Sequence, residues 1–229
     1  MIMSTIAFIG LGRMGHPMAQ NLLASGFNVQ VFDVDSEAAK QLAPFGAVVA
    51  NSIEEVVDGA STVITMLPAG SHVRSVYLGD LHGGVGVLNL VSPSTLMIDC
   101  STIDPDSARL VANEAANKRV LFVDAPVSGG VAGAKAATLT FIVGGSDEAF
   151  SKANAILQYM GKNVFHAGKA LARFVFDRHE FVDRALVVGV GVKQPGVRVV
   201  GGMGPIFRTA HAGPHLDGLA RAQFVGDQR

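Results

Sequence analysis

Residues 6–33 read IAFIGLGRMGHPMAQNLLASGFNVQVFD, and this stretch decides the fold. Its first four residues form an apolar run that predicts a strand, and a glycine-rich turn follows at residues 10–15. We expect an amphipathic helix over residues 16–25, with Gly26 as its stop, and a second strand over residues 28–32. A strand, a glycine-rich turn, a helix and a second strand in this order are typical of a dinucleotide-binding unit.

The three glycines of the turn suit a pyrophosphate. Gly10 permits the tight turn, Gly12 lets the backbone approach the phosphates, and Gly15 allows close packing of helix on strand. The start of the helix adds unpaired N–H groups and positive potential. Glycines at such a turn can also serve packing alone, but their position inside the strand–turn–helix–strand unit favours a dinucleotide.

Asp33 ends the second strand and indicates which dinucleotide is bound. A carboxylate at this point accepts hydrogen bonds from the ribose hydroxyls of NAD, and its charge repels the additional phosphate of NADP. Val34 and Asp35 follow it, so no arginine is at hand to receive that phosphate. The alternative is a solvated aspartate in a turn. The register favours the ribose, and the sequence predicts NAD rather than NADP.

Strand-like and helix-like segments go on alternating as far as residue 166. We expect further strands at residues 63–67, 96–98, 121–123 and 139–143. Helices are expected at residues 36–42 with Ser36 as the cap, after Asp104-Pro105, and at residues 147–160. This order predicts an α/β fold of the Rossmann type, with a doubly wound, mainly parallel sheet.

Residues 167–229 differ from the segment before them in composition and in periodicity. Glycine, valine and arginine crowd together there without a period of 2 or 3.6 residues. His179, His211 and His215 form no metal-binding pattern, and we expect no metal site. The predicted division is an NAD-binding domain at residues 1–166 and an irregular tail at residues 167–229.

The composition excludes several classes of protein. The formal net charge of −1 gives no reason to expect a nucleic acid or an anionic membrane as a partner. Cys100 is the single cysteine, which suits a reducing compartment. The sequence contains no run of the roughly 18 apolar residues that a membrane span needs, and the first strand begins by about Thr5, which leaves no targeting segment. We therefore expect a cytoplasmic protein.

Four ordered segments carry a resemblance to a known family. The run at residues 8–22 resembles the amino-terminal signature of the β-hydroxyacid dehydrogenases, and residues 66–68, 98–105 and 124–130 match that family's later motifs in the same order. Within this family, the sequences of these motifs are most similar to those of the 3-hydroxyisobutyrate dehydrogenase group. The resemblance implies NAD-dependent oxidation of 3-hydroxyisobutyrate to methylmalonate semialdehyde, a step of valine catabolism, and a homo-oligomer in the intact family.

The resemblance also implies roles for residues of this sequence. It assigns contacts with the cofactor to Gly10, Leu11, Gly12, Arg13, Met14, Gly15, Asp33, Leu67, Pro68 and Thr102. It assigns the substrate carboxylate to Ser128, Gly129 and Gly130, although Ser-Gly-Gly also fits an ordinary turn. His72 is expected to be an exposed histidine on a helix.

One family feature is absent from the sequence. The resemblance implies a catalytic lysine on a helix just beyond residue 170, but residues 170–180 read ALARFVFDRHE and the next lysine is Lys193. We therefore assign no catalytic residue. Reading the codons of Gly-Ala-Gly-Gln one base later gives Ala-Leu-Ala-Arg, the residues at 170–173, so a frameshift is our hypothesis. The alternatives are an inactive NAD-binding fragment and a related reductase, such as one acting on tartronate semialdehyde.

Overall fold

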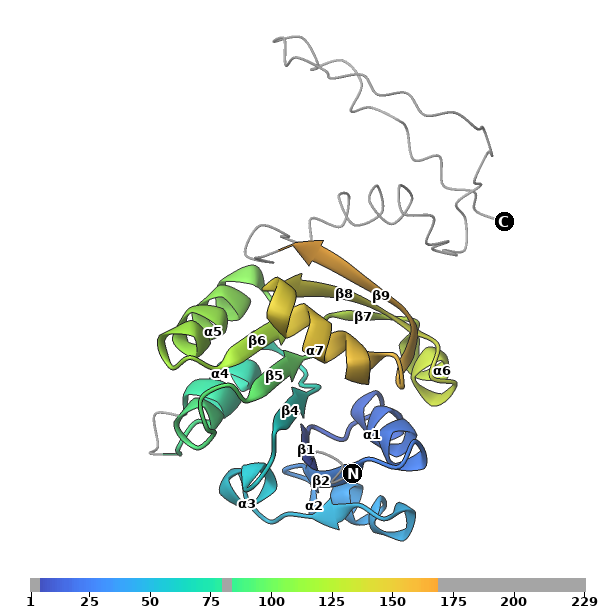
Figure 1. The fold of residues 1–229 in the computed structure, drawn as a ribbon. Helices are drawn as coiled ribbons and strands as arrows, with labels where there is room; N and C mark the ends of the chain where they lie inside the picture. The colour runs from blue at the N-terminus through green and yellow to red at the C-terminus, as the bar shows by residue number, and fades with distance from the viewer. Residues whose placement is uncertain (1–4, 80–83, 169–229) are drawn as a thin grey trace, which may run out of the picture. The chain divides into compact units, whose positions relative to one another are not determined.

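The computed structural model describes residues 5–79 and 84–168 (Figure 1). The structural statements that follow concern these residues. Our predictions for the missing lysine and for the tail beyond Gly168 lie outside them.

The described residues build one sheet of nine strands. Its order is β3-β2-β1-β4-β5-β6-β8-β7, with β9 paired to β8. The strands are β1 (Thr5–Ile9), β2 (Asn28–Phe32), β3 (Val48–Val49), β4 (Thr62–Thr65), β5 (Leu96–Asp99), β6 (Leu121–Asp124), β7 (Val127–Ser128), β8 (Leu139–Gly145) and β9 (Gly161–Gly168). The first six strands run parallel, β8 runs antiparallel to β6 and β7, and β9 runs parallel to β8. The expectation of a mainly parallel sheet is confirmed.

Seven α-helices of the described residues cover both faces of this sheet. They are α1 (Gly15–Ala24), α2 (Ser36–Lys40), α3 (Ile53–Val57), α4 (Gly70–Leu78), α5 (Pro105–Asn117), α6 (Gly130–Lys135) and α7 (Asp147–Leu157). Helices α1, α2, α6 and α7 pack over one hydrophobic cluster, and α3, α4 and α5 over a second. Strand residues alternate between the two clusters, as Phe8 and Ile9 do, because side chains of a strand point to opposite faces. Figure 1 shows α7 lying across the sheet beside β6 and β8.

Two local expectations need correction. The cap of α2 is Asp35, whose Oδ1 accepts from the Glu37 N–H at 3.1 Å, because Ser36 is already the first helical residue. The strand expected at residues 63–67 ends at Thr65, since its neighbour β1 turns away at Gly10. Asp104 does begin α5 as expected, with its Oδ1 accepting from the Ser107 N–H at 2.8 Å.

Within the parts of the chain that the structure describes, no helix has both the length and the apolar character needed to cross a membrane.

Candidate functional site

The candidate site lies at one edge of the sheet. Because β1, β2, β4, β5 and β6 run parallel, their carboxyl ends meet at that edge, and ligands of such folds bind there. The glycine-rich turn follows β1 and Asp33 follows β2. Pro68 and Thr102 follow β4 and β5 and are both exposed. The structure therefore brings the predicted cofactor residues to the same edge.

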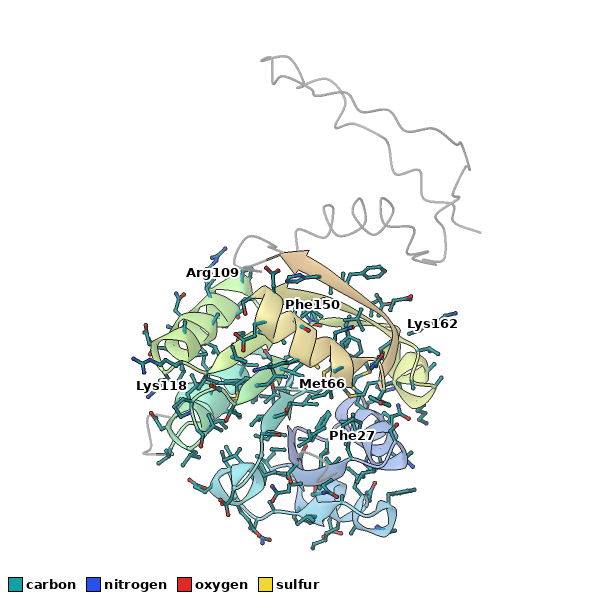
Figure 2. The ribbon with its side chains drawn as sticks, in the orientation of Figure 1. Phe27, Met66, Arg109, Lys118, Phe150 and Lys162 are labelled. Carbon is teal, nitrogen blue, oxygen red and sulfur yellow. The ribbon has the colours of Figure 1, made fainter. Side chains whose placement is uncertain are left out.

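Packing within the protein explains two of the three glycines. Gly10 has φ +94°, and a Cβ on it would collide with the carbonyl oxygen of Met66, which Figure 2 labels beside β4. A Cβ on Gly15 would collide with the carbonyl oxygen of Gly10. Both positions therefore need glycine whether or not a ligand is bound.

Packing does not explain Gly12. Its φ lies outside the left-handed region, it is exposed, and a Cβ built on it meets no described protein atom within 4 Å. The space is open on the side where α1 begins. No side chain caps that end of α1, and its first turn holds no acidic residue; α4 and α6 share both properties, whereas Asp35, Ser52, Asp104 and Ser146 cap α2, α3, α5 and α7. An open backbone surface at an uncapped helix start fits a pyrophosphate.

Asp33 is held by the backbone on both sides. Its Oδ2 accepts from the Leu11 N–H at 2.6 Å and its Oδ1 accepts from the Asp35 N–H at 2.8 Å. Each carboxylate oxygen keeps a second lone pair for a ribose hydroxyl. Val34, the next residue, has 96% of its surface exposed.

A row of polar side chains crosses the sheet at the same edge. Thr65, Asp99 and Asp124 are register partners on β4, β5 and β6. They follow Val63, Met97 and Phe122 by two residues, so they share the face that packs against α4 and α5. Thr65 and Asp99 are buried, with 0% and 1% of their surface exposed, and Asp124 is half-buried.

Hydrogen bonds connect this row to the loops that follow the strands. Asp99 Oδ1 accepts from Thr65 Oγ1 at 2.8 Å, from Ser101 Oγ at 2.5 Å and from the Ser101 N–H at 3.1 Å. Ser101 Oγ in turn accepts from the Leu67 N–H at 2.8 Å. Thr65 Oγ1 lies 2.9 Å from the hydroxyl of Tyr77 on α4, which must donate here because the threonine proton goes to Asp99.

The second oxygen of Asp99 differs from the first. Oδ2 is buried and has no hydrogen-bond partner among the described residues. Burial raises the pKa of Asp99 to about 6, although the bonds from Ser101 and Thr65 oppose the shift. Burial, followed by the charge of Asp99, raises the pKa of Asp124 to about 8. At neutral pH the two carboxyl groups therefore hold about one negative charge between them.

The candidate substrate motif lies on the neighbouring elements. Ser128 pairs with Thr140 of β8, and Gly129 and Gly130 have φ values of +129° and +60° at the start of α6. A Cβ on Gly130 would meet nothing within 4 Å. Helix α6 contacts α1, and the Asn21 side chain donates to the Ala134 carbonyl at 2.7 Å. The motif is thus attached to the helix that follows the glycine-rich turn.

The structure adds residues to the site for which the sequence suggested no role. Thr65, Tyr77, Asp99 and Ser101 lie on separate elements, and only strand register and helix packing bring them together. A polar residue at the end of a buried apolar run, as in residues 96–99, was the available signal. His72 is exposed on α4 as expected. In residues 5–79 and 84–168 no cluster of histidine, cysteine and carboxylate side chains could hold a metal ion.

Comparisons with known proteins agree with this geometry. A family model described as the NAD binding domain of 6-phosphogluconate dehydrogenase matches residues 5–168. A 3-hydroxyisobutyrate dehydrogenase of Pseudomonas aeruginosa is 54% identical over 166 residues, which are 72% of this chain and 54% of that protein. An NAD-dependent L-serine dehydrogenase of the same organism is 50% identical over 166 residues, with the same coverage of 72% and 54%.

A solved structure is similar as well. The 3-hydroxyisobutyrate dehydrogenase of Mycobacterium tuberculosis with L-serine has a TM-score of 0.71 and 42% sequence identity, covering 82% of this chain and 60% of that one. The chain spans about half the length of the curated relatives it matches.

Proposed function

The chain belongs to the family of the NAD binding domain of 6-phosphogluconate dehydrogenase, and from this premise we propose that it is the nucleotide-binding part of a 3-hydroxyisobutyrate dehydrogenase. The observation that carries the proposal is Gly12, a glycine that packing within the protein does not require, at the uncapped start of α1. When bound, NAD accepts a hydride from the carbon that bears the substrate hydroxyl.

Different residues at this edge of the sheet bind different parts of the cofactor. The turn at residues 10–15 binds the pyrophosphate through its backbone, and Asp33 accepts from the adenosine ribose. The charge of Asp33, together with Val34 in place of an arginine, supports NAD rather than NADP. Leu67, Pro68 and Thr102 receive the nicotinamide end, because they follow the next two strands of the sheet.

The substrate is a small 3-hydroxy acid bound by Ser128, Gly129 and Gly130. A hydroxyl group and exposed backbone N–H groups can hold a carboxylate without a bulky side chain between them. L-Serine is the second candidate, supported by the 50% identical relative named as an L-serine dehydrogenase. Serine and 3-hydroxyisobutyrate share a carboxylate and a primary hydroxyl, and differ in an ammonium against a methyl group. A related reductase, such as one acting on tartronate semialdehyde, stays an alternative.

The chain has no lysine at the position where the family resemblance implies the group for proton transfer. A group must take the hydroxyl proton as hydride leaves, and positioned acid–base groups contribute roughly 10²–10⁴-fold to the rate. Residues 170–192 contain no lysine, so we propose that this chain binds NAD with little or no turnover. We keep the division into a domain at residues 1–166 and a tail at residues 167–229 as part of the proposal, with the frameshift as its cause.

We propose three further properties, which concern the pathway, the compartment and the oligomeric state. The reaction places the parent enzyme in valine catabolism. The free and buried Cys100 supports a reducing compartment such as the cytoplasm. The homo-oligomer of the family is proposed for the protein that carries the complete helical domain.

Two assays on matched proteins test the proposal. The first protein is the chain as given, and in the second the residues from 170 onward are those of the shifted reading frame. Both are titrated with NADH by fluorescence. Both are also assayed for NADH formation from 3-hydroxyisobutyrate, L-serine and D-glycerate. We expect both proteins to bind NADH and only the shifted-frame version to turn over substrate. A given chain that fails to bind NADH would contradict the nucleotide site. Equal turnover by both proteins would contradict the assignment of the missing lysine.

A further inference from the structure

The buried Asp99 combines two features that a structural role alone does not account for. Its Oδ1 accepts three hydrogen bonds, whereas its Oδ2 accepts none from the described residues. Leaving a buried acceptor unpaired costs about 1–3 kcal/mol, and more when the group is charged. A serine, with a single oxygen, could accept part of the same network without leaving a second polar atom unpaired.

The hydrogen-bonded oxygen, Asp99 Oδ1, connects two loops through Ser101. Ser101 gives its hydroxyl proton to Asp99 Oδ1, so its oxygen lone pairs face the Leu67 N–H. This fixes the start of the loop after β4 to the start of the loop after β5. Those are the loops assigned above to the nicotinamide end.

The unpaired oxygen contributes charge. The polar row continues from Asp99 to Asp124, its register partner on β6. No lysine, arginine or histidine is paired with either carboxylate in the described part of the chain. Among the described residues, the pair therefore holds a negative charge with no counter-ion at this edge of the sheet. The nicotinamide ring is positive in NAD⁺ and neutral in NADH, so a nearby fixed charge acts on the two forms differently.

We propose that Asp99 is a positioning residue for the dinucleotide, which acts through Ser101 to lock the loops after β4 and β5 together and which sets a buried negative charge behind them that favours NAD⁺ over NADH. This inference rests on the proposed function, because it takes the nicotinamide to lie at these loops.

The groups that face Asp99 determine how the preference varies with pH. Tyr77 reaches the network from α4, Cys100 follows Asp99 in the chain, and Asp124 lies on β6. Burial and the Asp99 charge raise the pKa values of Tyr77 and Cys100, so both stay neutral. Asp99 loses its charge below about pH 6, and Asp124 gains one above about pH 8. The preference for NAD⁺ is expected to grow with pH in these two steps.

The test compares dissociation constants of the full chain for NAD⁺ and NADH, measured by calorimetry at pH 7. Ser101→Ala breaks the link, and because the Ser101 hydroxyl also lowers the pKa of Asp99, this variant is compared with the wild type at pH 9, where Asp99 stays charged. We expect it to raise both constants about 3- to 10-fold there with an unchanged ratio. Asp99→Asn removes the charge, so we expect it to raise the constant for NAD⁺ about 3- to 10-fold more than that for NADH. Ser146→Ala removes the cap of α7, a helix that packs on the opposite face of the sheet from Asp99. This variant is the matched control for lost stability and should leave the ratio unchanged.

The outcomes separate this inference from the proposed function. A wild-type chain that binds neither form contradicts the nucleotide site itself. If the wild type binds both forms and Asp99→Asn leaves the ratio unchanged, the charge is refuted. If Ser101→Ala leaves both constants unchanged, the link is refuted. If Asp99→Asn does not fold, the ratio of the wild type between pH 5 and 9 decides, because a ratio that stays flat overturns the inference and one that rises with pH supports it.

Discussion

The Leu11 N–H donates to Asp33 Oδ2 at 2.6 Å, and this bond ties the glycine-rich turn to the end of the second strand. The Gly10 N–H, which donates to the Phe32 carbonyl at 3.0 Å, reinforces the junction. Asp33 therefore supports the turn before any ribose reaches it. Asp33, which the sequence connects with the ribose or with a turn, thus also holds the backbone of the turn in place.

Replacing Asp33 with Asn should weaken both binding and folding. An amide has one acceptor oxygen, so either the Leu11 or the Asp35 N–H loses its partner, at a cost of about 1–3 kcal/mol. Each kcal/mol lowers the Tm by about 2–4 °C in a domain of this size. Calorimetric melting measures the change, and an NADH titration measures the accompanying loss of affinity. Asp35→Asn, which preserves a good helix cap, should change neither quantity by much, and an unaltered Tm for Asp33→Asn would count against the dual role.

Alanine at Gly12 and alanine at Gly15 should give opposite results. At Gly12 the added Cβ meets open space in the protein, so the Tm holds while the dissociation constant for NADH rises at least ~10-fold, about 1.4 kcal/mol. At Gly15 the Cβ collides with the Gly10 carbonyl, so overpacking costs about 1–3 kcal/mol of stability. Melting curves and NADH titrations of the two variants provide the comparison. A Gly12→Ala chain that binds NADH normally would show that the pyrophosphate lies elsewhere.

The choice between NAD and NADP should depend on Asp33 and Val34 together. Val34→Arg supplies a charged donor from a position that is already exposed, but the carboxylate of Asp33 still repels the phosphate. With Asp33→Ser added, a charge-assisted bond of about 1.5–3 kcal/mol becomes available, which corresponds to a gain of roughly 10- to 100-fold in NADPH affinity. Fluorescence titration of both single variants and the double variant checks this. A full gain from Val34→Arg alone would remove Asp33 from the discrimination.

The buried carboxyl pair should make stability depend on pH. Both folded-state pKa values lie above the ordinary 3.8, so ionisation weakens the folded state. Stability is then greatest near pH 4 and falls as the pH rises through about 6 and about 8. Asp124→Asn removes the second step, and we expect its Tm to exceed that of the wild type by at least ~2–4 °C at pH 9. The two proteins should melt together only near pH 3, below the ordinary pKa of 3.8, where Asp124 is protonated in the folded and in the unfolded state. A difference that persists there would point to packing instead.

The fold was predictable from the sequence where one local pattern carried all the information. The strand, the glycine-rich turn and the helix of residues 6–25 form a contiguous unit, and the central strands β1, β4, β5 and β6 each contain an apolar run. Helix α3 had a local signal too, since Ser52 and Glu55 form a capping pair in which the Glu55 N–H donates to Ser52 Oγ at 3.1 Å. The apolar stripe of α3 is only one turn long, which is too short to predict a helix by itself.

The carboxyl pair and strand β9 could not be predicted in the same way. Thr65 and Asp99 are 34 residues apart, and only the register of β4 with β5 makes them neighbours. In β9, lysine, asparagine and histidine interrupt the apolar alternation, so the strand depends on tertiary contacts. One of these is the stacking of His166 on Phe150 of α7, with ring centroids 4.2 Å apart; Figure 2 labels Phe150.

The two hydrophobic clusters on opposite faces of the sheet have a consequence for how the site can change. Helix α1, which follows the glycine-rich turn, is supported by one cluster, while Tyr77 and the loop at Leu67 belong to the other. Substitutions more than about 7–10 Å apart without shared partners usually add independently. The contact of Gly10 with Met66 joins the two regions, but substitutions deeper in either cluster are expected to act on α1 or on the loop at Leu67 separately. Evolution or a designer can therefore repack one face of the sheet without rebuilding the other.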